Sequence, residues 1–219
     1  MNGKLIVVEG LDGSGKATQS QILYETLKQA GQPVMKVSFP DYRSDSSALV
    51  KMYLNGAFGS DPNAVNPYAA SSFYAVDRYA SYLQNWKQFY AEGGIIIADR
   101  YTTSNAIHQC AKLPEEQWND FIKWLFHYEY ELLGIPAPDQ IIYLRVDPEV
   151  SQKLLAQRYD GDASKKDIHE ANTEYLKQAR RAADYCAEHL SWRTVECVRN
   201  DRMRTAEDIA LEIFQLITD

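Results

Sequence analysis

Short apolar runs rich in β-branched residues alternate along this chain with longer amphipathic segments. The apolar runs predict strands at residues 4–9, 33–39, 93–99, 139–146 and 193–198. The stretches between them are long enough for crossover helices, among them residues 17–31 and 66–90. Because strands joined by helices lie parallel and are covered on both faces, the pattern predicts a three-layer α/β fold with a central five-stranded parallel sheet.

The segments that follow the strands are where chemistry is expected, since ligands bind beyond the carboxyl ends of the strands in sheets of this kind. These segments read GLDGSGKAT, FPDYR, DRYTTSN, DPEVSQ and NDRMRT. All of them carry charged or polar side chains. We therefore expect the functional site to be assembled from these five segments.

Length and composition limit the domain number and the compartment. With 219 residues and 45% hydrophobic content, the chain can bury a sizeable core, and a single domain over residues 1–219 is expected. Its clearest interruption is the Gly/Asp/Ser/Lys-rich segment 158–168, which indicates a mobile charged loop. No signal-peptide pattern or membrane-length apolar run is present, so a cytoplasmic location without membrane contact is expected. The spacing of the cysteines suits neither disulfides nor zinc, which predicts buried free thiols at Cys110, Cys186 and Cys197.

The charge of the chain bears on its partners. Its formal net charge is −7 at neutral pH. Proteins that bind the nucleic-acid backbone do so by neutralising phosphates with a basic face, so a nucleic-acid partner is not expected. Any phosphate that this protein handles must instead be held by a local cluster of cations.

Residues 10–16 match the phosphate-binding pattern G-x-x-x-x-G-K, directly after a predicted strand and before a predicted helix. Gly10, Gly13 and Gly15 permit the tight turn that this loop requires. The backbone N–H groups around Ser14 and the positive end of the following helix would converge on one anion. Lys16 would add a point charge for the β- and γ-phosphates. The loop therefore predicts binding of a nucleotide such as ATP.

The loop departs from the usual pattern at Ala17, where a Ser or Thr hydroxyl normally binds Mg²⁺. One interpretation is that this metal ligand is lost. Mg²⁺ keeps several waters, however, and takes only one or two protein ligands besides substrate phosphates, so a water can fill the position. Thr18 cannot replace the hydroxyl directly, because one residue along a helix turns the side chain by about 100°. It can still contact the α-phosphate.

Taken together, the motifs VVEGLDGSGKATQSQ, FPDY, FYAVDRY, GGIIIADRYTTSNAIHQCAK and APDQIIYLRVDPEVSQK resemble those of thymidylate kinases, in order and spacing. The resemblance extends along nearly the whole chain. It implies the P-loop NTPase fold with a mobile lid at residues 158–168, and transfer of the γ-phosphate of ATP to dTMP with Mg²⁺. It also implies a homodimer.

The resemblance assigns Asp12 to the 3′-hydroxyl of the nucleotide sugar, although such a residue can also cap the amides of its own loop. Some family members carry an arginine at the next position, which is Gly13 here. Members without that arginine supply cations from the lid. This suggests catalytic roles for Arg158 and, with less support, for Lys165 and Lys166, although a charged loop can simply be solvated.

Asp99 and Arg100 follow a predicted strand and should lie near the phosphate loop. Asp99 can bind Mg²⁺ directly or through water. Arg100 can reach phosphate oxygens with its planar guanidinium group. The alternative is a local ion pair between the two side chains.

In the predicted helix 66–90, Tyr74 and Arg78 are four residues apart and share one face. An aromatic ring for the base and an arginine for the phosphate would form a monophosphate site, and the resemblance places substrate-binding residues here. Aromatic residues at this spacing are also common in plain cores. Phe73 replaces Tyr74 if the alignment shifts by one residue.

The segment FPDYR is similar to a family segment in which Phe39 packs against the base and a nearby arginine holds the acceptor phosphate. Aligned without gaps, the arginine position is Tyr42, and Arg43 lies one residue later. Arg43 is therefore a hypothesis. Asp41 is the residue we consider as a general base if the acceptor is a nucleoside.

The segment SNAIHQ replaces the S-x-x-A-Y-Q that is frequent in the family. Ser104 and Gln109 match it, with Gln109 expected at the base. His108 stands where the family tyrosine crowds the sugar 2′ position, so sugar and base selectivity can differ here; it can also be an ordinary, partly buried histidine. After the last strand, Asn200 is expected near the adenine of ATP.

A nucleotide monophosphate acceptor is already largely dianionic at neutral pH, so the predicted reaction needs no general base. The protein must align two polyanions and neutralise the transferring group. The cations expected to do so are Lys16, Arg78, Arg100, Arg158 and magnesium. Two alternatives remain: a kinase of another deoxynucleotide or of a deoxynucleoside, and a nucleotide-binding regulator that has lost catalysis through Ala17.

Overall fold

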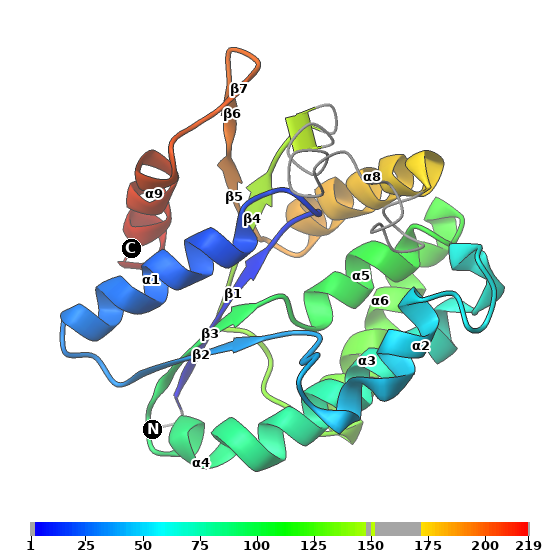
Figure 1. The fold of residues 1–219 in the computed structure, drawn as a ribbon, viewed down its shortest axis with the longest axis horizontal. Helices are drawn as coiled ribbons and strands as arrows, with labels where there is room; N and C mark the ends of the chain where they lie inside the picture. Colours follow the sequence, from blue (N-terminus) through cyan, green and yellow to red (C-terminus); the bar gives the residue numbers. More distant parts are fainter. Residues whose placement is uncertain (1–2, 148–149, 152–171, 219) are drawn as a thin grey trace.

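The computed structural model describes residues 3–147, 150–151 and 172–218. Its centre is a sheet of five strands in the order β2-β3-β1-β4-β5, and every neighbouring pair is parallel (Figure 1). The predicted fold class is therefore confirmed. The strands are β1 Lys4–Glu9, β2 Val34–Ser38, β3 Ile95–Asp99, β4 Gln140–Arg145 and β5 Arg193–Glu196. The predicted lid 158–168, with Arg158, Lys165 and Lys166, lies outside the described residues.

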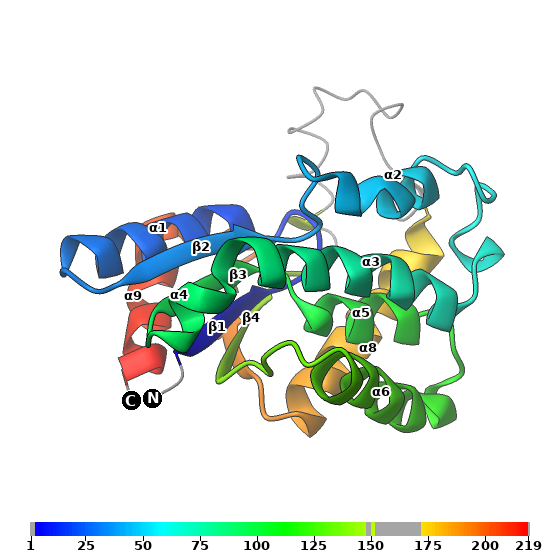
Figure 2. The ribbon, with the colours of Figure 1, turned by 90° about the horizontal axis from the view of Figure 1, so that it is seen from below.

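Helices cover both faces of this sheet (Figure 2). They are α1 Lys16–Gln29, α2 Ala48–Leu54, α3 Pro67–Ser81, α4 Lys87–Ala91, α5 Thr102–Cys110, α6 Trp118–Phe126, α8 Thr173–His189 and α9 Ala206–Thr218. Two π-helical turns extend α3 and α6, at η3 Tyr82–Trp86 and η5 His127–Leu132. Short 3₁₀ turns occur at η1 Asp45–Ser47, η2 Pro62–Ala64 and η4 Glu115–Gln117.

Burial on both faces explains why the strands read as continuous apolar runs. Side chains alternate between the two faces of a strand. In β1, Ile6 and Val8 therefore belong to the cluster formed with α1 and α9. Leu5 and Val7 face the opposite way and pack in a cluster with Trp86 of η3.

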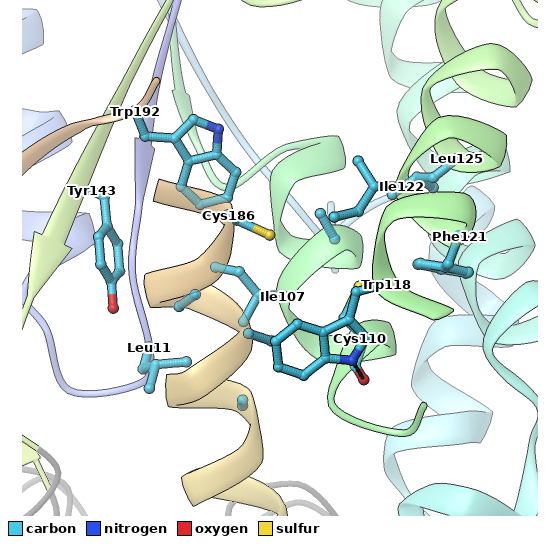
Figure 3. Close-up of a cluster of buried hydrophobic side chains, with 14 residues drawn as sticks. Leu11, Ile107, Cys110, Trp118, Phe121, Ile122, Leu125, Tyr143, Cys186 and Trp192 are labelled. Atoms are coloured by element: carbon cyan, nitrogen blue, oxygen red, sulfur yellow. Dashed lines mark hydrogen bonds between the residues drawn. The ribbon is translucent and has the colours of Figure 1, made fainter. Parts of the chain in front are cut away.

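A third cluster joins α5, α6 and α8 and fixes the position of α5 beside the sheet (Figure 3). It contains Cys110 and Cys186, while Cys197 packs in the α1–α9 cluster. All three are buried free thiols, as predicted. Burial raises the pKa of Cys110 and of Cys197 to about 12, so both are neutral thiols. None of the described helices has the length and apolarity that crossing a bilayer requires.

Local signals account for the helix ends that the sequence predicted. Asn66 accepts a hydrogen bond from the Ala69 N–H at 2.9 Å, and Pro67 occupies the first turn of α3. Gly31, with φ of 75°, follows the end of α1. The predicted helix 66–90 is interrupted by the π-helical turn η3, which the hydrophobic pattern did not indicate.

The last predicted strand, 193–198, divides into two elements. β5 ends at Glu196, and β6 Val198–Arg199 pairs in antiparallel fashion with β7 Arg202–Met203. Asn200 and Asp201 form the turn between them with φ of 51° and 57°. Two consecutive left-handed residues suit a two-residue hairpin, and Asn and Asp tolerate this conformation better than most residues do. The apolar pattern could not separate this hairpin from β5.

Candidate active site

A cleft of about 630 Å³ lies at the carboxyl ends of the strands, where ligands of parallel sheets bind. Its walls come from the loop after β1, the ends of β2 and β3, and helices α3 and α5. Most of the predicted site residues meet here: Asp12, Gly13, Ser14, Gly15, Lys16, Ala17, Thr18, Phe39, Tyr74, Arg78, Asp99, Arg100, Ser104, His108 and Gln109. Gly10, Arg43 and Asn200 are described but do not line it.

The loop 10–16 has the tight geometry that its glycines allow. Gly13 and Gly15 have φ of 79° and 89°, in the left-handed region that favours glycine. A Cβ on Gly10 would lie 2.5 Å from Ser14 Oγ and 2.9 Å from the carbonyl oxygen of Leu144, so a side chain does not fit there. Gly15 caps α1, which leaves the first amides of this helix directed at the cleft. The loop can therefore hold an anion with backbone donors.

Lys16 is buried at the start of α1 and bends back over the loop. Its Nζ donates to the carbonyl oxygen of Leu11 at 2.8 Å and lies 4.0 Å from Asp12 Oδ1. Burial and the nearby Arg100 lower the pKa of Lys16 to about 8. A bound polyphosphate would favour the charged form of this side chain.

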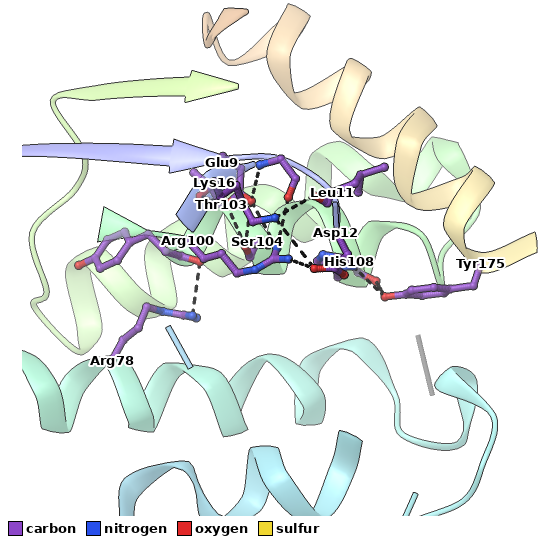
Figure 4. A network of polar contacts seen from close by, with 12 residues as sticks. Glu9, Leu11, Asp12, Lys16, Arg78, Arg100, Thr103, Ser104, His108 and Tyr175 are labelled. Carbon is purple, nitrogen blue, oxygen red and sulfur yellow. Dashed lines mark hydrogen bonds and ion pairs between the residues drawn. The ribbon is translucent and has the colours of Figure 1, made fainter. Parts of the chain in front are cut away.

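Arg100 connects the phosphate loop with α5 (Figure 4). Its guanidinium forms an ion pair with Asp12, donates to Ser104 Oγ at 3.3 Å, and lies 3.7 Å from Glu9 Oε1. Burial alone would lower the pKa of Arg100, but Asp12 and Glu9 raise it above its ordinary value. The predicted alternative was a local pair with Asp99, whereas the guanidinium pairs with Asp12 of the loop and lies near Glu9 at the end of β1. Its backbone φ of 67° is uncommon for a residue other than glycine.

Glu9 is a site residue that the sequence interpretation missed. It is fully buried at the end of β1. Its carboxylate accepts from the Gly10 N–H at 2.9 Å, from Thr103 Oγ1 at 2.6 Å and from Ser104 Oγ at 2.8 Å. The available signal was a charged residue at the end of an apolar strand, directly before the glycine loop. Glu9 thus holds the start of α5 against the loop.

The aromatic residues of α3 can now be assigned to two environments. Tyr74 lines the cleft, with its ring edge-on to Tyr53 at 6.5 Å between centroids. Phe73 instead packs against Tyr53 and Phe58, with centroids 6.3 and 5.7 Å away, and is not among the described residues that line the cleft. The geometry therefore favours Tyr74 over Phe73 as the aromatic residue that meets a ligand.

Arg78 of α3 lines the cleft together with Tyr74, but its charge is already paired with Glu129. It is 1% exposed, and Nε and Nη2 donate to Glu129 of η5 at 2.6 and 2.5 Å. Nη1 donates to the carbonyl oxygen of Tyr101 at 3.4 Å. Burial disfavours the charged form, yet Glu129 keeps the pKa of Arg78 raised. Glu129 could not be identified from the sequence, because its partner lies 51 positions away.

Helix α5 presents a polar face to the cleft through Ser104, Asn105, His108 and Gln109. Gln109 is fully buried, and neither atom of its amide has a hydrogen-bond partner among the described residues. Buried amide groups are seldom left so, which suggests that a ligand completes this site. Asn105 was not predicted, although it directly follows Ser104 in the same motif.

His108 contacts α8, the helix that follows residues 152–171, which the structure does not describe. Its Nδ1 lies 3.2 Å from the hydroxyl of Tyr175, and that hydroxyl donates to the His108 carbonyl oxygen at 2.9 Å. Burial and the nearby Arg100 lower the pKa of His108 to about 3. This histidine is therefore neutral at physiological pH.

Residues 41–43 differ from their predicted arrangement. Arg43 is exposed, and its backbone N–H donates to Asp41 Oδ1 at 3.2 Å. Neither Arg43 nor Asp41 is among the described residues that line the cleft, whereas Tyr42 is. The gap-free alignment, with Tyr42 at the family's arginine position, therefore agrees better with the structure.

The opposite end of the cleft is formed after the β6–β7 hairpin. Asn200 has a left-handed backbone and forms part of the hairpin turn. The turn is exposed, and Asn200 does not line the cleft. Met203, Arg204 and Ala206 line the cleft instead. Gln19 of α1 donates to the Ala206 carbonyl oxygen at 3.0 Å and so joins this wall to the phosphate loop.

The described residues contain no group of three or more side chains of the kinds that commonly bind metal ions. Mg²⁺ takes few protein ligands and relies on substrate phosphates and water. Asp99 lies on the cleft wall, close enough to Lys16 to influence its pKa. The Asp99 carboxylate beside the anion-binding loop fits a magnesium ion held mainly by phosphates.

A parallel five-stranded sheet, a glycine-rich loop at a helix N-terminus, and a buried lysine with an arginine beside them define a P-loop phosphotransferase. A sequence model described as thymidylate kinase matches residues 8–203. The chain belongs to the thymidylate kinase family of ATP-dependent phosphotransferases, which confirms the resemblance.

Named relatives are similar along most of the chain. The thymidylate kinase of Pelotomaculum thermopropionicum is 34% identical over 214 residues, covering 95% of each chain. That of Mycobacterium tuberculosis is 32% identical over 185 residues, covering 83% of each. Among solved structures, the thymidylate kinase of Candida albicans has a TM-score of 0.74 at 24% identity, covering 99% of this chain and 92% of that one. At this identity the last comparison supports the fold alone.

Proposed function

We propose that this protein transfers the γ-phosphate of ATP to dTMP, with both nucleotides in the cleft described above. The observation that carries this proposal is the polar and aromatic part of the cleft beside the phosphate loop. Gln109 is fully buried there, with two amide atoms that have no partner among the described residues. Tyr74 and Phe39 line the same cleft with aromatic rings. A flat base with polar edges would satisfy both features.

The acceptor base is assigned to Arg78, Asn105 and Gln109. The sequence predicts Arg78 at the acceptor phosphate, but Glu129 already compensates its charge at 2.5 Å. Its remaining N–H groups are better suited to a carbonyl oxygen of a base than to a dianion. Asp12 and His108 would then lie along the sugar, between the base and the phosphate loop.

The phosphates are assigned to the cations at the other end of the cleft. Loop amides, Lys16 and Arg100 would hold and neutralise the transferring group, which is the main requirement of phosphoryl transfer. The acceptor phosphate is largely dianionic at neutral pH and attacks without help from a base. Asp41, our candidate base for a nucleoside acceptor, lies outside the cleft lining, which favours a monophosphate acceptor.

Magnesium is proposed at Asp99, with a water in the place that a hydroxyl at Ala17 would occupy. When bound, it would neutralise phosphate charge and help to align the two nucleotides. Ala17 is exposed at the cleft, so the position is accessible to water. We also propose that Arg158, and to a lesser extent Lys165 and Lys166, supply lid cations.

The adenine of ATP is proposed to lie against the wall formed by Met203, Arg204 and Ala206. These residues replace Asn200 as the expected contacts, because they line the cleft and Asn200 does not. The hydrogen bond from Gln19 of α1 to the Ala206 carbonyl oxygen, which joins this wall to the helix after the phosphate loop, supports the assignment.

A homodimer is proposed from an exposed apolar stripe on α3 and η3. Val76, Tyr79 and Leu83 are 42%, 38% and 44% exposed, and their spacing of three and four residues places them on one helical face. The mass in solution tests this: Leu83→Asp should give a monomer by light scattering. Leu211→Asp, on α9, is the control and should leave the mass unchanged. A wild-type monomer at micromolar concentration would contradict the dimer.

A single domain in a reducing cytoplasmic compartment completes the proposal. The reducing compartment is supported by the three cysteines, which are buried free thiols and form no disulfide. Subcellular fractionation of the source cells, followed by detection of the protein in each fraction, would test the location.

The activity is tested by acceptor-dependent ADP release from ATP and Mg²⁺, comparing dTMP, dUMP, dCMP, AMP, UMP and thymidine. We expect dTMP to be the best acceptor. Lys16→Met should abolish turnover and control for contaminating kinases. No ADP release with any acceptor, combined with binding of ATP and dTMP, would favour the nucleotide-binding regulator instead. Strong turnover with UMP would direct attention to His108.

A further inference from the structure

Glu129, which was not among the predicted site residues, accepts four hydrogen bonds from side chains of α3 and α5. It is fully buried in the π-helical turn η5. Its Oε2 accepts from Arg78 Nε at 2.6 Å and Thr102 Oγ1 at 2.8 Å, and its Oε1 accepts from Arg78 Nη2 at 2.5 Å and Asn105 Nδ2 at 3.3 Å. One carboxylate therefore joins α3, α5 and η5.

This carboxylate determines which Arg78 donors face the cleft. A guanidinium has five N–H groups. Glu129 takes two of them, and the Tyr101 carbonyl oxygen takes one at 3.4 Å. Two N–H groups of Arg78 remain. Because the Arg78 side chain lines the cleft, these two groups are the ones available to a ligand. Arg78 thus presents N–H groups with its charge already balanced.

The same carboxylate determines the orientation of the Asn105 amide. Asn105 Nδ2 has two hydrogens, which point to the Ser71 carbonyl oxygen at 3.2 Å and to Glu129 at 3.3 Å. An ionised carboxylate only accepts hydrogen bonds, so the reverse orientation of the amide would set two acceptors against each other. The Asn105 carbonyl oxygen is therefore the atom left for a ligand in the cleft.

We propose that Glu129 is a positioning residue that fixes the polarity of base recognition, with donors from Arg78 beside an acceptor from Asn105. This pair fits a base edge that places a carbonyl oxygen next to a ring N–H, as thymine and uracil do. Cytosine presents the reverse pattern, an amino group next to a ring nitrogen without hydrogen. The inference rests on the proposed acceptor site.

The test is Glu129→Gln, which keeps the shape but replaces one acceptor oxygen with a donor. The Asn105 amide is then free to reverse, and Arg78 faces an N–H group. We expect kcat/KM for dTMP and dUMP to fall about 10- to 100-fold, the range for hydrogen bonds to charged groups. For dCMP, kcat/KM as an acceptor should fall much less. If dCMP acts only as a competitive inhibitor, its affinity, measured as the inhibition constant, should fall much less. The KM for ATP should stay within about twofold of wild type.

Glu131→Gln is the matched control. Glu131 lies two residues further in η5, is exposed, and pairs with His127 at 2.8 Å. It should leave the dTMP:dCMP ratio unchanged. Glu129→Asp serves if Glu129→Gln does not fold, because it keeps the buried charge pair while withdrawing the carboxylate by about 1.5 Å. The weakest contact, to Asn105, is lost first, so the ratio should fall by a smaller factor.

Equal losses of kcat/KM for dTMP and dCMP in the folded variants would overturn the inference and leave Glu129 with a purely structural role. An unchanged kcat/KM for dTMP in folded Glu129→Gln would also overturn it. Neither result affects the proposed function, since the wild type would still phosphorylate dTMP. Absence of turnover in the wild type is a different outcome, which would refute the proposed function itself.

Discussion

Gln109 offers a prediction in which stability and activity move in opposite directions. Its side chain is fully buried, and both amide atoms have no hydrogen-bond partner among the described residues. A buried polar group left in this state costs about 1–3 kcal/mol. Gln109→Met retains most of the volume and removes the amide. We therefore expect the free energy of unfolding to rise by about 1–3 kcal/mol in the ligand-free protein.

The same substitution removes the groups that would meet the acceptor base. Loss of about 1–3 kcal/mol of binding corresponds to a KM for dTMP about 5- to 150-fold higher. Thermal unfolding followed by circular dichroism gives the first quantity; the melting temperature should rise by about 2–4 °C per kcal/mol for a chain of this size. Steady-state ADP release gives the second.

Gln140→Met is the matched control. Its Oε1 is also buried without a partner among the described residues, but Gln140 begins β4 and lies outside the cleft lining. This variant should change stability alone. The reasoning is refuted if Gln109→Met lowers the melting temperature and leaves the KM for dTMP unchanged, because the amide would then be a structural group.

The remaining predictions concern the phosphates, the aromatic wall and the metal. The pKa of Lys16 is lowered to about 8, and ATP phosphates favour its charged form. ATP binding should therefore take up a proton at pH values of about 8 and above, and the affinity should fall as pH rises through this range, by up to tenfold per pH unit. Calorimetry in buffers of different ionisation enthalpy measures this uptake, and its persistence in Lys16→Met would contradict the assignment. Tyr74→Leu should raise the KM for dTMP about tenfold, whereas Phe73→Leu should lower the melting temperature without changing the KM. The reverse pattern would show that Phe73 meets the base. Ala17→Ser should change turnover less than about tenfold if water already serves magnesium, and a gain of several hundredfold would show instead that the native site is impaired.

Much of the fold follows from periodicity in the sequence. The apolar runs identified all five strands of the central sheet, because both faces of each strand are buried and local sequence reflects this directly. The limits of the last strand were wrong, since Val198 continues the apolar pattern but pairs in a separate hairpin. The π-helical turns were also missed, because one extra residue in a helical turn hardly alters the pattern.

The loop side of the cleft could be predicted because its residues are close together in sequence. Gly13, Gly15 and Lys16 lie within one tight turn, and their spacing in the sequence predicts the loop. Strand order adds Asp99 and Arg100, since β3 lies beside β1. Local sequence and simple topology were sufficient for these residues.

The sequence by itself determined the layered fold, the phosphate loop and the residues at the strand ends. The tertiary structure decided the partners of those residues. Arg78 and Glu129 are 51 positions apart, and only the packing of η5 against α3 brings them together. Packing likewise chose Tyr74 over Phe73 and excluded Arg43 and Asn200 from the cleft lining. Periodic burial depends on residues that are close together in the sequence, so the sequence shows it directly. The pairing of buried charges depends on which elements pack together in the tertiary structure.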